Sequence, residues 1–376
     1  MLALTVLLFE VVCFSLREAK PKDSMIQVVE KPDPQLEREV AAFLLASPES
    51  IGACGEHDPR WLHVLRGALG HHPMMLIARE QEAGPIVGYL PLALVASRLF
   101  GRFLVSLPYL NRAGVVAADP AIASQLIGKA IELSDQFNTK YLELRHGQPT
   151  EHASLPSSRA DKFRMVLKLY ENDAALMKAV GPKVRNLIRK GEKNNLSIRW
   201  GGRDVLADFY EVFSVNMRDL GTPVYSRELF GQIVDKFQGE AELCVIDFEG
   251  NPVACSLLVH DDGRKMTQVP SASALREFNH TSANMWMYYM LLLRAMERGS
   301  ERFDFGRSSE GSGTYNFKRQ WGAEPEPTVW QYHVRSGDMG SMRPDNPKNQ
   351  RRIAIWQKLP VWLTRVVGPR IVRGIP

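Results

Sequence analysis

The chain has 376 residues, which is long enough for two domains with substantial hydrophobic cores. Hydrophobic residues make up 45% and charged residues 24% of the chain, which is ordinary for a soluble globular protein. The formal net charge of +5 permits anionic partners without naming one.

The cysteines give no sign of a metal site. Cys13, Cys54, Cys244 and Cys255 form no CxxC pair and have no His-rich metal spacing. Cys244 and Cys255 lie in apolar, strand-like runs, so we expect them to be buried free thiols in a reducing cytosol. We therefore expect no metal and no resident cofactor.

The first 24 residues stand apart from the globular pattern. MLALTVLLFEVVCFSL is apolar, but it is short for a membrane span and contains Glu10. It also lacks the basic region and the cleavage site of a signal peptide. Because Met25 directly precedes the first globular run, IQVVEKP, we interpret residues 1–24 as an upstream extension, with a misplaced start as one explanation.

The first half of the chain alternates helical and strand-like patterns. Helices are predicted at 34–47, 58–70 and 121–137, and strands at 74–79, 86–95 and 141–145. The cluster EHDPRW at 56–61 is interpreted as a helix cap with a core tryptophan rather than as acid–base chemistry.

The second half begins near residue 161. Helices are predicted at 171–180, 182–196, 204–220, 226–237 and 282–298, and strands at 163–170, 242–248, 252–260, 265–271 and 303–305. The helix after Pro182 is the most basic of these and carries Lys183, Arg185, Arg189 and Lys190. Two interpretations stay open for this helix: a solvated face, or a contact for an anion such as tRNA.

A repeat links the two halves. A helix, the linker NTK and the strand Leu-Glu-Leu at 142–144 recur 161 residues later as a helix, GSE and Phe-Asp-Phe at 303–305. Equal helix and linker lengths predict two related α/β units. Functional residues should then lie in the cleft between the units.

The most informative stretch is FDFGRSSEGSGTYNFKRQWG, at 303–322. A short strand leads into a loop of glycines and hydroxyl residues, and then into a helical turn that carries Lys318 and Arg319. Such a combination fits an anion or oxyanion site, while an ordinary mobile surface loop is the alternative. The chain contains neither GxxxxGK[ST] nor GxGxxG, which disfavours nucleotide binding of those kinds.

The ending GxxxFKxxWG, behind FDFG and a long Met-rich helix, resembles the Fem-type aminoacyltransferases. More closely, it resembles the FemAB-related proteins of bacterial exopolysaccharide systems, over about residues 26–335. The resemblance implies an α/β fold of two tandem GNAT-like domains with mixed central sheets, at 25–160 and 161–335. A basic tail, 336–376, follows them.

The same resemblance assigns roles to individual residues. Lys318 would be the catalytic cation that neutralises charge on the ester or phosphate during acyl transfer. Phe317 would pack on the donor, and Tyr315 beside it is counted as a substrate contact. Asn111 and Arg112 lie in SLPYLNRAGVV, which resembles the substrate loop of the first domain.

Phosphate contacts and the general base match the family pattern less well. The family holds phosphates with an Arg and a Tyr four residues later, whereas GTPVYSRELF offers Tyr225 and Arg227 without that spacing. Arg307 is the better anion-binding candidate because it lies in the glycine-rich loop. No general base is assigned, since Asp119, the nearest acid after the substrate loop, is out of register.

Two donors remain open. CoA-dependent GNAT enzymes usually carry [RQ]xxGx[GA] before the long helix, but ALREFNHTSANMW has Asn279 and Thr281 where small residues are expected. This departure favours aminoacyl-tRNA over acyl-CoA as co-substrate. The implied acceptor is a lipid- or nucleotide-linked saccharide of the cell envelope or an exopolysaccharide. A non-catalytic scaffold that retains the fold is the alternative from another functional class.

The last 31 residues contain seven bases and no acid. Because the bases alternate with Ile, Trp, Leu and Val, this segment fits the surface of an anionic membrane. A strap across a groove between domains fits equally well. The expected location is cytoplasmic, with the tail as a contact to the inner face of the membrane.

Overall fold

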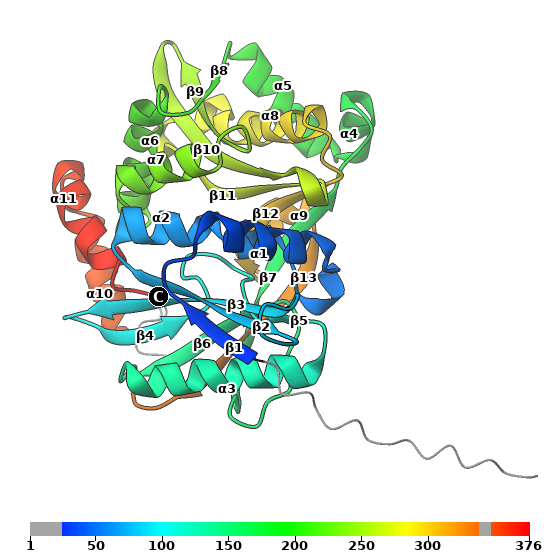
Figure 1. The fold of residues 1–376 in the computed structure, drawn as a ribbon. Coiled ribbons are helices and arrows are strands. Elements are labelled where there is room, and N and C mark those ends of the chain that lie inside the picture. The colour runs from blue at the N-terminus through cyan, green and yellow to red at the C-terminus, as the bar shows by residue number, and fades with distance from the viewer. Residues whose placement is uncertain (1–24, 338–346) are drawn as a thin grey trace, which may run out of the picture.

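The computed structural model describes residues 25–337 and 347–376, so the predicted extension at 1–24 lies outside the described residues. Thirteen strands in the described part form one sheet (Figure 1). Their order is β1-β2-β3-β4-β6-β13-β7-β12-β11-β10-β9-β8, with β5 paired to β3. The chain is thus an α/β protein with a single mixed sheet running through both halves.

The first half contains β1 (Met25–Val29), α1 (Pro34–Ala46), α2 (Arg60–Leu69), β2 (His72–Arg79), β3 (Ile86–Ser97), β4 (Gly101–Val105), β5 (Val116–Ala117), α3 (Pro120–Gln136) and β6 (Tyr141–His146). The second half contains β7 (Ser157–Lys168), α4 (Asp173–Ala179), α5 (Pro182–Lys193), β8 (Ser197–Gly201), α6 (Leu206–Asp219), α7 (Arg227–Lys236), β9 (Ala241–Phe248), β10 (Asn251–Asp261), β11 (Met266–Ala274), α8 (Ala283–Glu297), β12 (Arg302–Ser309), α9 (Gly313–Arg319) and β13 (Glu324–Val334). Two further helices, α10 (Pro347–Trp356) and α11 (Val361–Val372), follow.

The predicted repeat is confirmed by strand pairing. In the first half, β1 to β4 are antiparallel neighbours, and β4 pairs with β6 in parallel after the crossover through α3. In the second half, β8 to β11 are antiparallel neighbours, and β11 pairs with β12 in parallel after the crossover through α8. Each half therefore folds by the same rule, with one parallel pair that requires a helical crossover.

Local sequence explains where the helices begin. The α1 and α3 helices both start on an Asp–Pro pair, Asp33–Pro34 and Asp119–Pro120. The Asp33 side chain accepts a hydrogen bond from the amide of Leu36 at 2.8 Å, and that of Asp119 accepts one from Ala121 at 2.6 Å. Each carboxylate caps a free amide, and each proline already has the backbone angle of a first helical turn.

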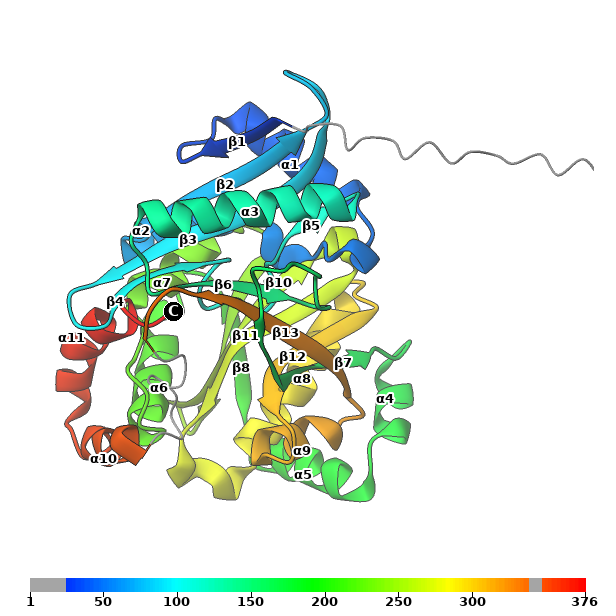
Figure 2. The same cartoon turned by 90° about the horizontal axis from the view of Figure 1, so that it is seen from below.

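The two halves share their central strands. β13 lies between β6 and β7 and is antiparallel to both, as the brown strand in Figure 2 shows. The last strand of the second half therefore completes the sheet of the first. The predicted boundary between residues 160 and 161 falls inside β7.

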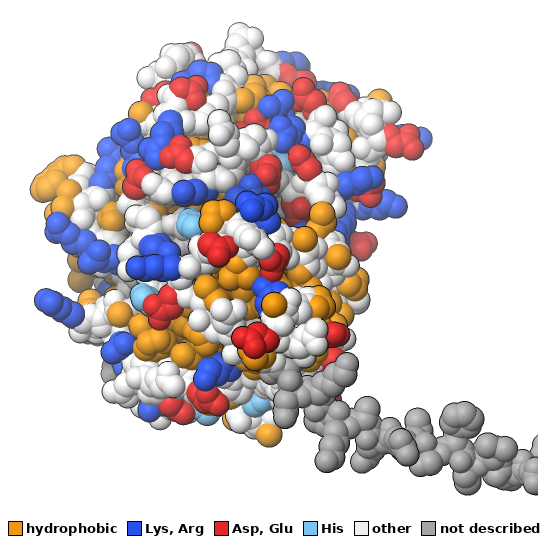
Figure 3. Space-filling model, viewed as in Figure 1, with side chains coloured by type: hydrophobic (Ala, Val, Ile, Leu, Met, Phe, Trp, Pro, Cys, Tyr) orange, Lys and Arg blue, Asp and Glu red, His pale blue; other side chains and the backbone are white. Residues whose placement is uncertain are grey.

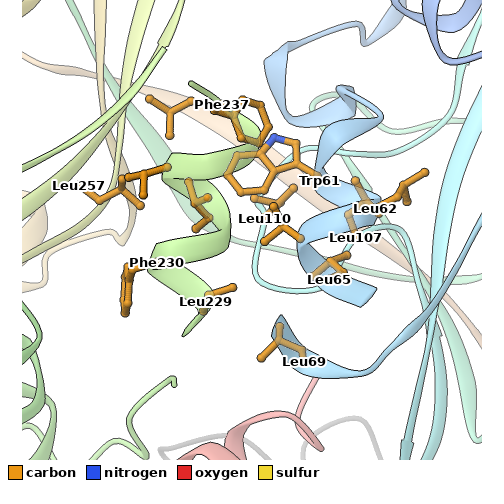
Figure 4. Packing of buried hydrophobic residues seen from close by; sticks show 14 of the residues in the cluster. Trp61, Leu62, Leu65, Leu69, Leu107, Leu110, Leu229, Phe230, Phe237 and Leu257 are labelled. Atoms are coloured by element: carbon orange, nitrogen blue, oxygen red, sulfur yellow. The ribbon is translucent and has the colours of Figure 1, made fainter. Parts of the chain in front are cut away.

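A hydrophobic core also joins the halves. It packs α2 of the first half against α7 of the second (Figure 4). At its centre the rings of Trp61 and Phe237 lie 4.6 Å apart, with Leu65, Leu110 and Phe230 nearby. This confirms Trp61 as a core residue. Separate cores pack α3 and α8 on the sheet, and Cys244 and Cys255 are buried free thiols, as predicted.

The C-terminal residues 347–376, which we call the strap, pack along the outside of both halves (Figures 1 and 2). α11 packs on α6, where Arg365 donates to the Ser214 hydroxyl at 2.8 Å. In the first half, the Tyr109 hydroxyl donates to the carbonyl of Val372 at 3.3 Å. The tail therefore spans the two halves, as the strap interpretation predicts.

Candidate functional site

Each half contains a point where its parallel strands diverge, and we call these points the first and second forks. In the first fork, β4 and β6 pair only at Leu104–Leu142 and Val105–Glu143. In the second fork, β11 and β12 pair at three positions, the last of them Gln268–Asp304. A fork breaks the hydrogen-bond ladder and frees backbone groups for other partners.

Lys318 lies at the second fork. Its Nζ donates hydrogen bonds to the carbonyls of Gly306 and Arg307 at 3.0 and 3.2 Å. These carbonyls are free because β12 bulges against β7 between Asp304 and Arg307, where Gly306 takes a positive φ of 77°. Burial lowers the pKa of Lys318 to about 8, while the Asp304 carboxylate opposes the shift. The ammonium is therefore charged at neutral pH and has one donor left.

Arg307 points the other way, toward the junction of the halves. Its guanidinium lies 3.8 Å from the ring centre of Trp330, and that of Arg145 lies 4.0 Å from the same ring. Burial and the charge of Arg145 lower the pKa of Arg307 to about 10. Among the described residues, no carboxylate or carbonyl accepts a hydrogen bond from the Arg307 side chain. Such a cation is suited to bind an anion.

The first fork is filled by the protein itself. The Arg145 side chain forms an ion pair with Glu143 at 2.6 Å, with both side chains almost fully buried. Its other end donates to the carbonyl of Leu110 at 2.6 Å, while the Arg145 amide donates to the Ser106 hydroxyl at 2.8 Å. The loop that follows is strained, because Leu107 and Tyr109 both have positive φ.

Asn111 and Arg112 are held in this loop by a buried carboxylate. Glu56 accepts hydrogen bonds from both of their amides, at 3.1 Å from Asn111. Burial raises the pKa of Glu56, and the charge of Asp304 adds to the shift. The Arg112 guanidinium reaches Glu326 of β13 at 3.7 Å. The EHDPRW cluster therefore shapes the predicted substrate loop, as well as supplying the core residue Trp61.

A cavity of about 300 Å³ lies between the halves. The first half contributes α2 and the loop at Pro108, Tyr109 and Leu110, and the second half contributes α6, α7 and residues 270–273 of β11. The wall on β11 thus begins two residues beyond the second fork. Tyr225 also lines the cavity, and Arg145 and Arg307 are close enough to act on its pKa, which burial raises to about 12.

A more polar cavity of about 380 Å³ lies beside the end of β6 and is lined by Arg112, Arg145 and His146. Neither ring nitrogen of His146 has a partner with hydrogen-bond geometry among the described residues. Burial lowers the pKa of His146 to about 4, an effect that the nearby Gln331 opposes, so the ring is neutral at physiological pH. Gly114 leaves room for this ring, because a Cβ there would lie 2.1 Å from it.

The structure does not bring all the predicted residues together. Arg227 is exposed on the first turn of α7 and is not part of the cavity wall that contains Tyr225. Phe317 packs on Tyr288 of α8, with ring centres 4.9 Å apart. Tyr315 is half-buried, and its ring meets the edge of Phe163 at 6.4 Å. Phe317 and Tyr315 thus lie on the α8 side of the second fork.

The basic helix α5 lies at the outer end of the second half, away from the first (Figure 1). It packs on α8 through Val184 and Ile188. Arg185 donates to the carbonyls of Met177 and Val180, so its role is to cap α4. The remaining predicted contact residues are exposed to solvent: Lys183, Arg189 and Lys190.

The start of α8 is closed to a ligand. Thr281, Ser282 and Ala283 are all buried, at 0, 6 and 3% exposure. The Thr281 hydroxyl accepts the amide of Ala283 at 3.1 Å, which already satisfies one free amide of the first turn. An anion such as a pyrophosphate needs these amides to be open.

Sequence reasoning missed Trp330, Arg145, Glu143 and His146. A signal for Arg145 and Glu143 was available, because they alternate with Leu142 and Leu144 in a strand that is otherwise mostly apolar. Charged residues on one face of a central strand must be paired or functional. In 25–337 and 347–376, no cluster of three metal-ligating side chains occurs, and no helix is long and apolar enough to cross a membrane.

The fold and the forks define an α/β protein built from two units of one topology. Residues 182–319 match the family model described as an acetyltransferase (GNAT) domain. No curated protein matches the sequence.

Among the solved structures that resemble most of this chain are the following three. FemX has a TM-score of 0.58 at 12% identity, over 88% of this chain and 100% of FemX. L-PGS from Bacillus licheniformis has a TM-score of 0.52 at 12% identity, over 91% of this chain and 99% of L-PGS. A tandem GNAT protein from the clavulanic acid biosynthesis pathway has a TM-score of 0.51 at 13% identity, over 84% and 100%. The predicted tandem GNAT-like fold is therefore confirmed, while identities this low establish the fold alone.

Proposed function

We propose that the protein is an acyltransferase that moves an aminoacyl group from a tRNA ester to a cell-envelope or exopolysaccharide precursor. The observation that carries the proposal is the second fork, where a buried ammonium retains one free donor beside a break in the sheet. The neighbouring Arg307, whose side chain has no carboxylate or carbonyl partner within the described residues, adds a cation for a phosphate of donor or acceptor. The resemblance of GxxxFKxxWG to the Fem-type motif supports the same reaction.

In this reaction an acceptor amine or hydroxyl attacks the carbonyl carbon of the donor ester. The new C–N or C–O bond forms and the C–O bond to the tRNA ribose breaks, and the proton that the nucleophile loses passes through solvent to the ribose oxygen, which leaves as a hydroxyl. Negative charge develops on the carbonyl oxygen and then on the leaving oxygen. The free donor of Lys318 would stabilise this charge, and its buried position would strengthen the interaction.

The donor is inferred from the closed start of α8. Residues 281–283 are buried and partly self-capped, so a CoA pyrophosphate has no open amides there. An aminoacyl-tRNA needs no such site, and the exposed bases Lys183, Arg189 and Lys190 of α5 offer a contact for its backbone.

The acceptor is inferred from the cavity between the halves. Its walls are mostly apolar and aromatic, including Trp61, Phe213 and Phe230, whereas Tyr225 brings a hydroxyl toward Arg145 and Arg307. This arrangement suits an acceptor with an apolar part and an anionic head. A lipid-linked saccharide phosphate combines both and fits better than a nucleotide-linked one.

Thermal unfolding with candidate donors tests the proposal. A ligand that binds the folded state raises the melting temperature by mass action. We expect a rise with aminoacyl-tRNA, none with acetyl-CoA, and loss of the rise in Lys183→Gln/Arg189→Gln. A matched variant at exposed lysines elsewhere, Lys31→Gln/Lys236→Gln, should keep it.

If acetyl-CoA raises the melting temperature and aminoacyl-tRNA does not, the donor is acetyl-CoA. The protein would then be a GNAT acetyltransferase of polysaccharide synthesis. If aminoacyl-tRNA, acetyl-CoA and UDP-sugars all leave the melting temperature unchanged, the chain is a non-catalytic scaffold.

A further inference from the structure

We propose that the outer face of the strap is a docking surface for an anionic lipid bilayer. The inference concerns a surface on the opposite side of α11 from its contact with α6. It requires no turnover, so it stands or falls independently of the proposed reaction.

One face of α11 is bound to the protein. Thr364, Gly368 and Val372 recur every four residues and are buried, so they form one stripe of the helix. Gly368 allows the closest approach, because a Cβ there would lie 2.8 Å from the backbone nitrogen of Val224. This stripe fixes the orientation of the helix on the second half.

The opposite stripe of α11 is also apolar but has no partner in the described chain. Trp362 and Val366, four residues apart, are 66% and 54% exposed, and Ile355 of α10 is 64% exposed. A helix that is apolar on both faces is normally buried on both. Leu99 and Leu220, at 75% and 50% exposure, lie next to residues that touch the strap and extend the apolar surface.

The charges of the strap itself have one sign, and the Glu211 carboxylate beside it is paired with Arg365. The strap contains no acidic residue after position 345. Its exposed bases have no carboxylate partner among the described residues: Arg351, Arg352, Lys358, Arg370 and Arg373. Arg98 and Arg102 of the β3–β4 hairpin, which meets the end of the strap, are exposed and unpaired as well. Figure 3 shows hydrophobic side chains gathered over α11 at the left edge, with Lys and Arg beside them.

An anionic bilayer is the occupant that this chemistry selects. A tryptophan and aliphatic side chains enter the boundary between headgroups and acyl chains, while the surrounding bases meet lipid phosphates. A second copy of the same face would bring the unpaired bases of both chains together, and this repulsion disfavours self-association. No described helix spans a membrane, so the strap would lie on the surface.

Co-sedimentation of the full chain with vesicles tests the surface. We expect binding to phosphatidylcholine vesicles that contain phosphatidylglycerol, at least about tenfold tighter than to phosphatidylcholine alone. Trp362→Ser/Val366→Ser and Arg351→Gln/Arg352→Gln should each lower this affinity about tenfold or more. All four side chains point to solvent, so these variants should keep the melting temperature of the parent.

Matched controls distinguish binding through the strap from non-specific binding of exposed apolar or basic side chains to vesicles. Leu45→Ser removes an equally exposed apolar side chain on α1, and Lys178→Gln/Lys236→Gln removes two exposed bases elsewhere. Neither control should change vesicle binding. Equal binding to neutral and anionic vesicles, an equal loss in the controls, or a dimer that Trp362→Ser/Val366→Ser converts to monomers would overturn the proposal.

Discussion

The two forks have the same strand topology but differ in how their polar groups are paired. In the first fork, the space left by diverging strands is taken by the Arg145 side chain, which is bound by Glu143 and loop carbonyls. In the second fork, a side chain from a separate helix, Lys318, satisfies two carbonyls and keeps one donor free. One fork therefore serves as a structural joint, and the other keeps unused binding capacity.

The role of each copy of a duplicated unit can therefore be inferred from how completely its polar groups are paired within the chain. Around the first fork each nitrogen of the Arg145 guanidinium has an oxygen partner, either on Glu143 or on the carbonyls of Leu107 and Leu110. Around the second, Lys318 is a buried cation and Arg307 a partly buried one, and both have donors left over among the described residues. Buried donors without acceptors are costly, so they mark the place where a ligand supplies the acceptor.

The largest expected effect is at the structural joint. Arg145→Met leaves the Glu143 carboxylate buried without its cation, which should lower the free energy of unfolding by about 3–5 kcal/mol. Urea denaturation followed by tryptophan fluorescence measures this change. Adding Glu143→Leu should restore much of the stability, since it removes the uncompensated charge. A loss below about 1 kcal/mol in the single variant would show that the first fork does not depend on this pair.

The second expected effect is at Lys318. Lys318→Met should lower aminoacyl transfer about 10²–10³-fold, because the positive charge at the second fork is lost. It should also lower the melting temperature, since the carbonyls of Gly306 and Arg307 lose their donor. Lys318→Arg keeps the positive charge, so it should retain more of the transfer activity and more of the thermal stability than Lys318→Met. A variant that is destabilised yet fully active would make Lys318 a purely structural residue.

The pH dependence separates the two uses of Lys318. Its pKa of about 8 lies below the ordinary 10.5, so the folded state releases this proton first. Activity that needs the charged form should fall as pH rises above about 8. The free energy of unfolding should instead rise with pH between about 8 and 10.5, because the unfolded chain binds more protons there than the folded chain does. Rate and melting profiles of the parent and Lys318→Arg test this, and parallel profiles would contradict it.

The smallest expected effect is in the cavity beside the second fork. Ala272→Leu adds side-chain volume to the β11 wall and should weaken binding of a lipid-linked acceptor analogue about tenfold. Fluorescence titration with a short-chain polyprenyl phosphate measures the affinity. Met25→Leu, at an exposed position on β1, is the matched control. Unchanged affinity in Ala272→Leu would place the acceptor elsewhere.

Much of the fold could be predicted from the sequence, because local signals determine it. α3, α8 and β6 lie within one residue of their predicted bounds, since caps and hydrophobic periodicity are local, and β12 starts one residue early but runs four residues past its predicted end. β1, β4, β5, β8 and β13 were missed. β13 contains two prolines in its first four residues, Pro325 and Pro327, and such a pattern argues against a central strand. β13 is nevertheless a strand because it pairs with β6 and β7, and no local sequence pattern predicts that pairing.

The candidate site was predictable only in part. Lys318 and Arg307 come from a contiguous motif and were found, and Tyr225 was found near a helix start. Trp330, Arg145 and Glu56 depend on contacts between residues far apart in sequence. Trp330 Nε1, for example, donates to the carbonyl of Asn111 at 3.1 Å across 219 positions. The roles of the predicted site residues remain predictions, and the variants above test them.

The position of β13 has a consequence for synthesis of the chain. Residues 324–334 leave the ribosome long after β6, yet they supply the strand that covers one edge of β6. Until then the first half presents an open sheet edge, which is a template for pairing with the wrong chain. A nascent chain stalled before residue 324 should therefore need chaperone protection that one stalled after 334 does not.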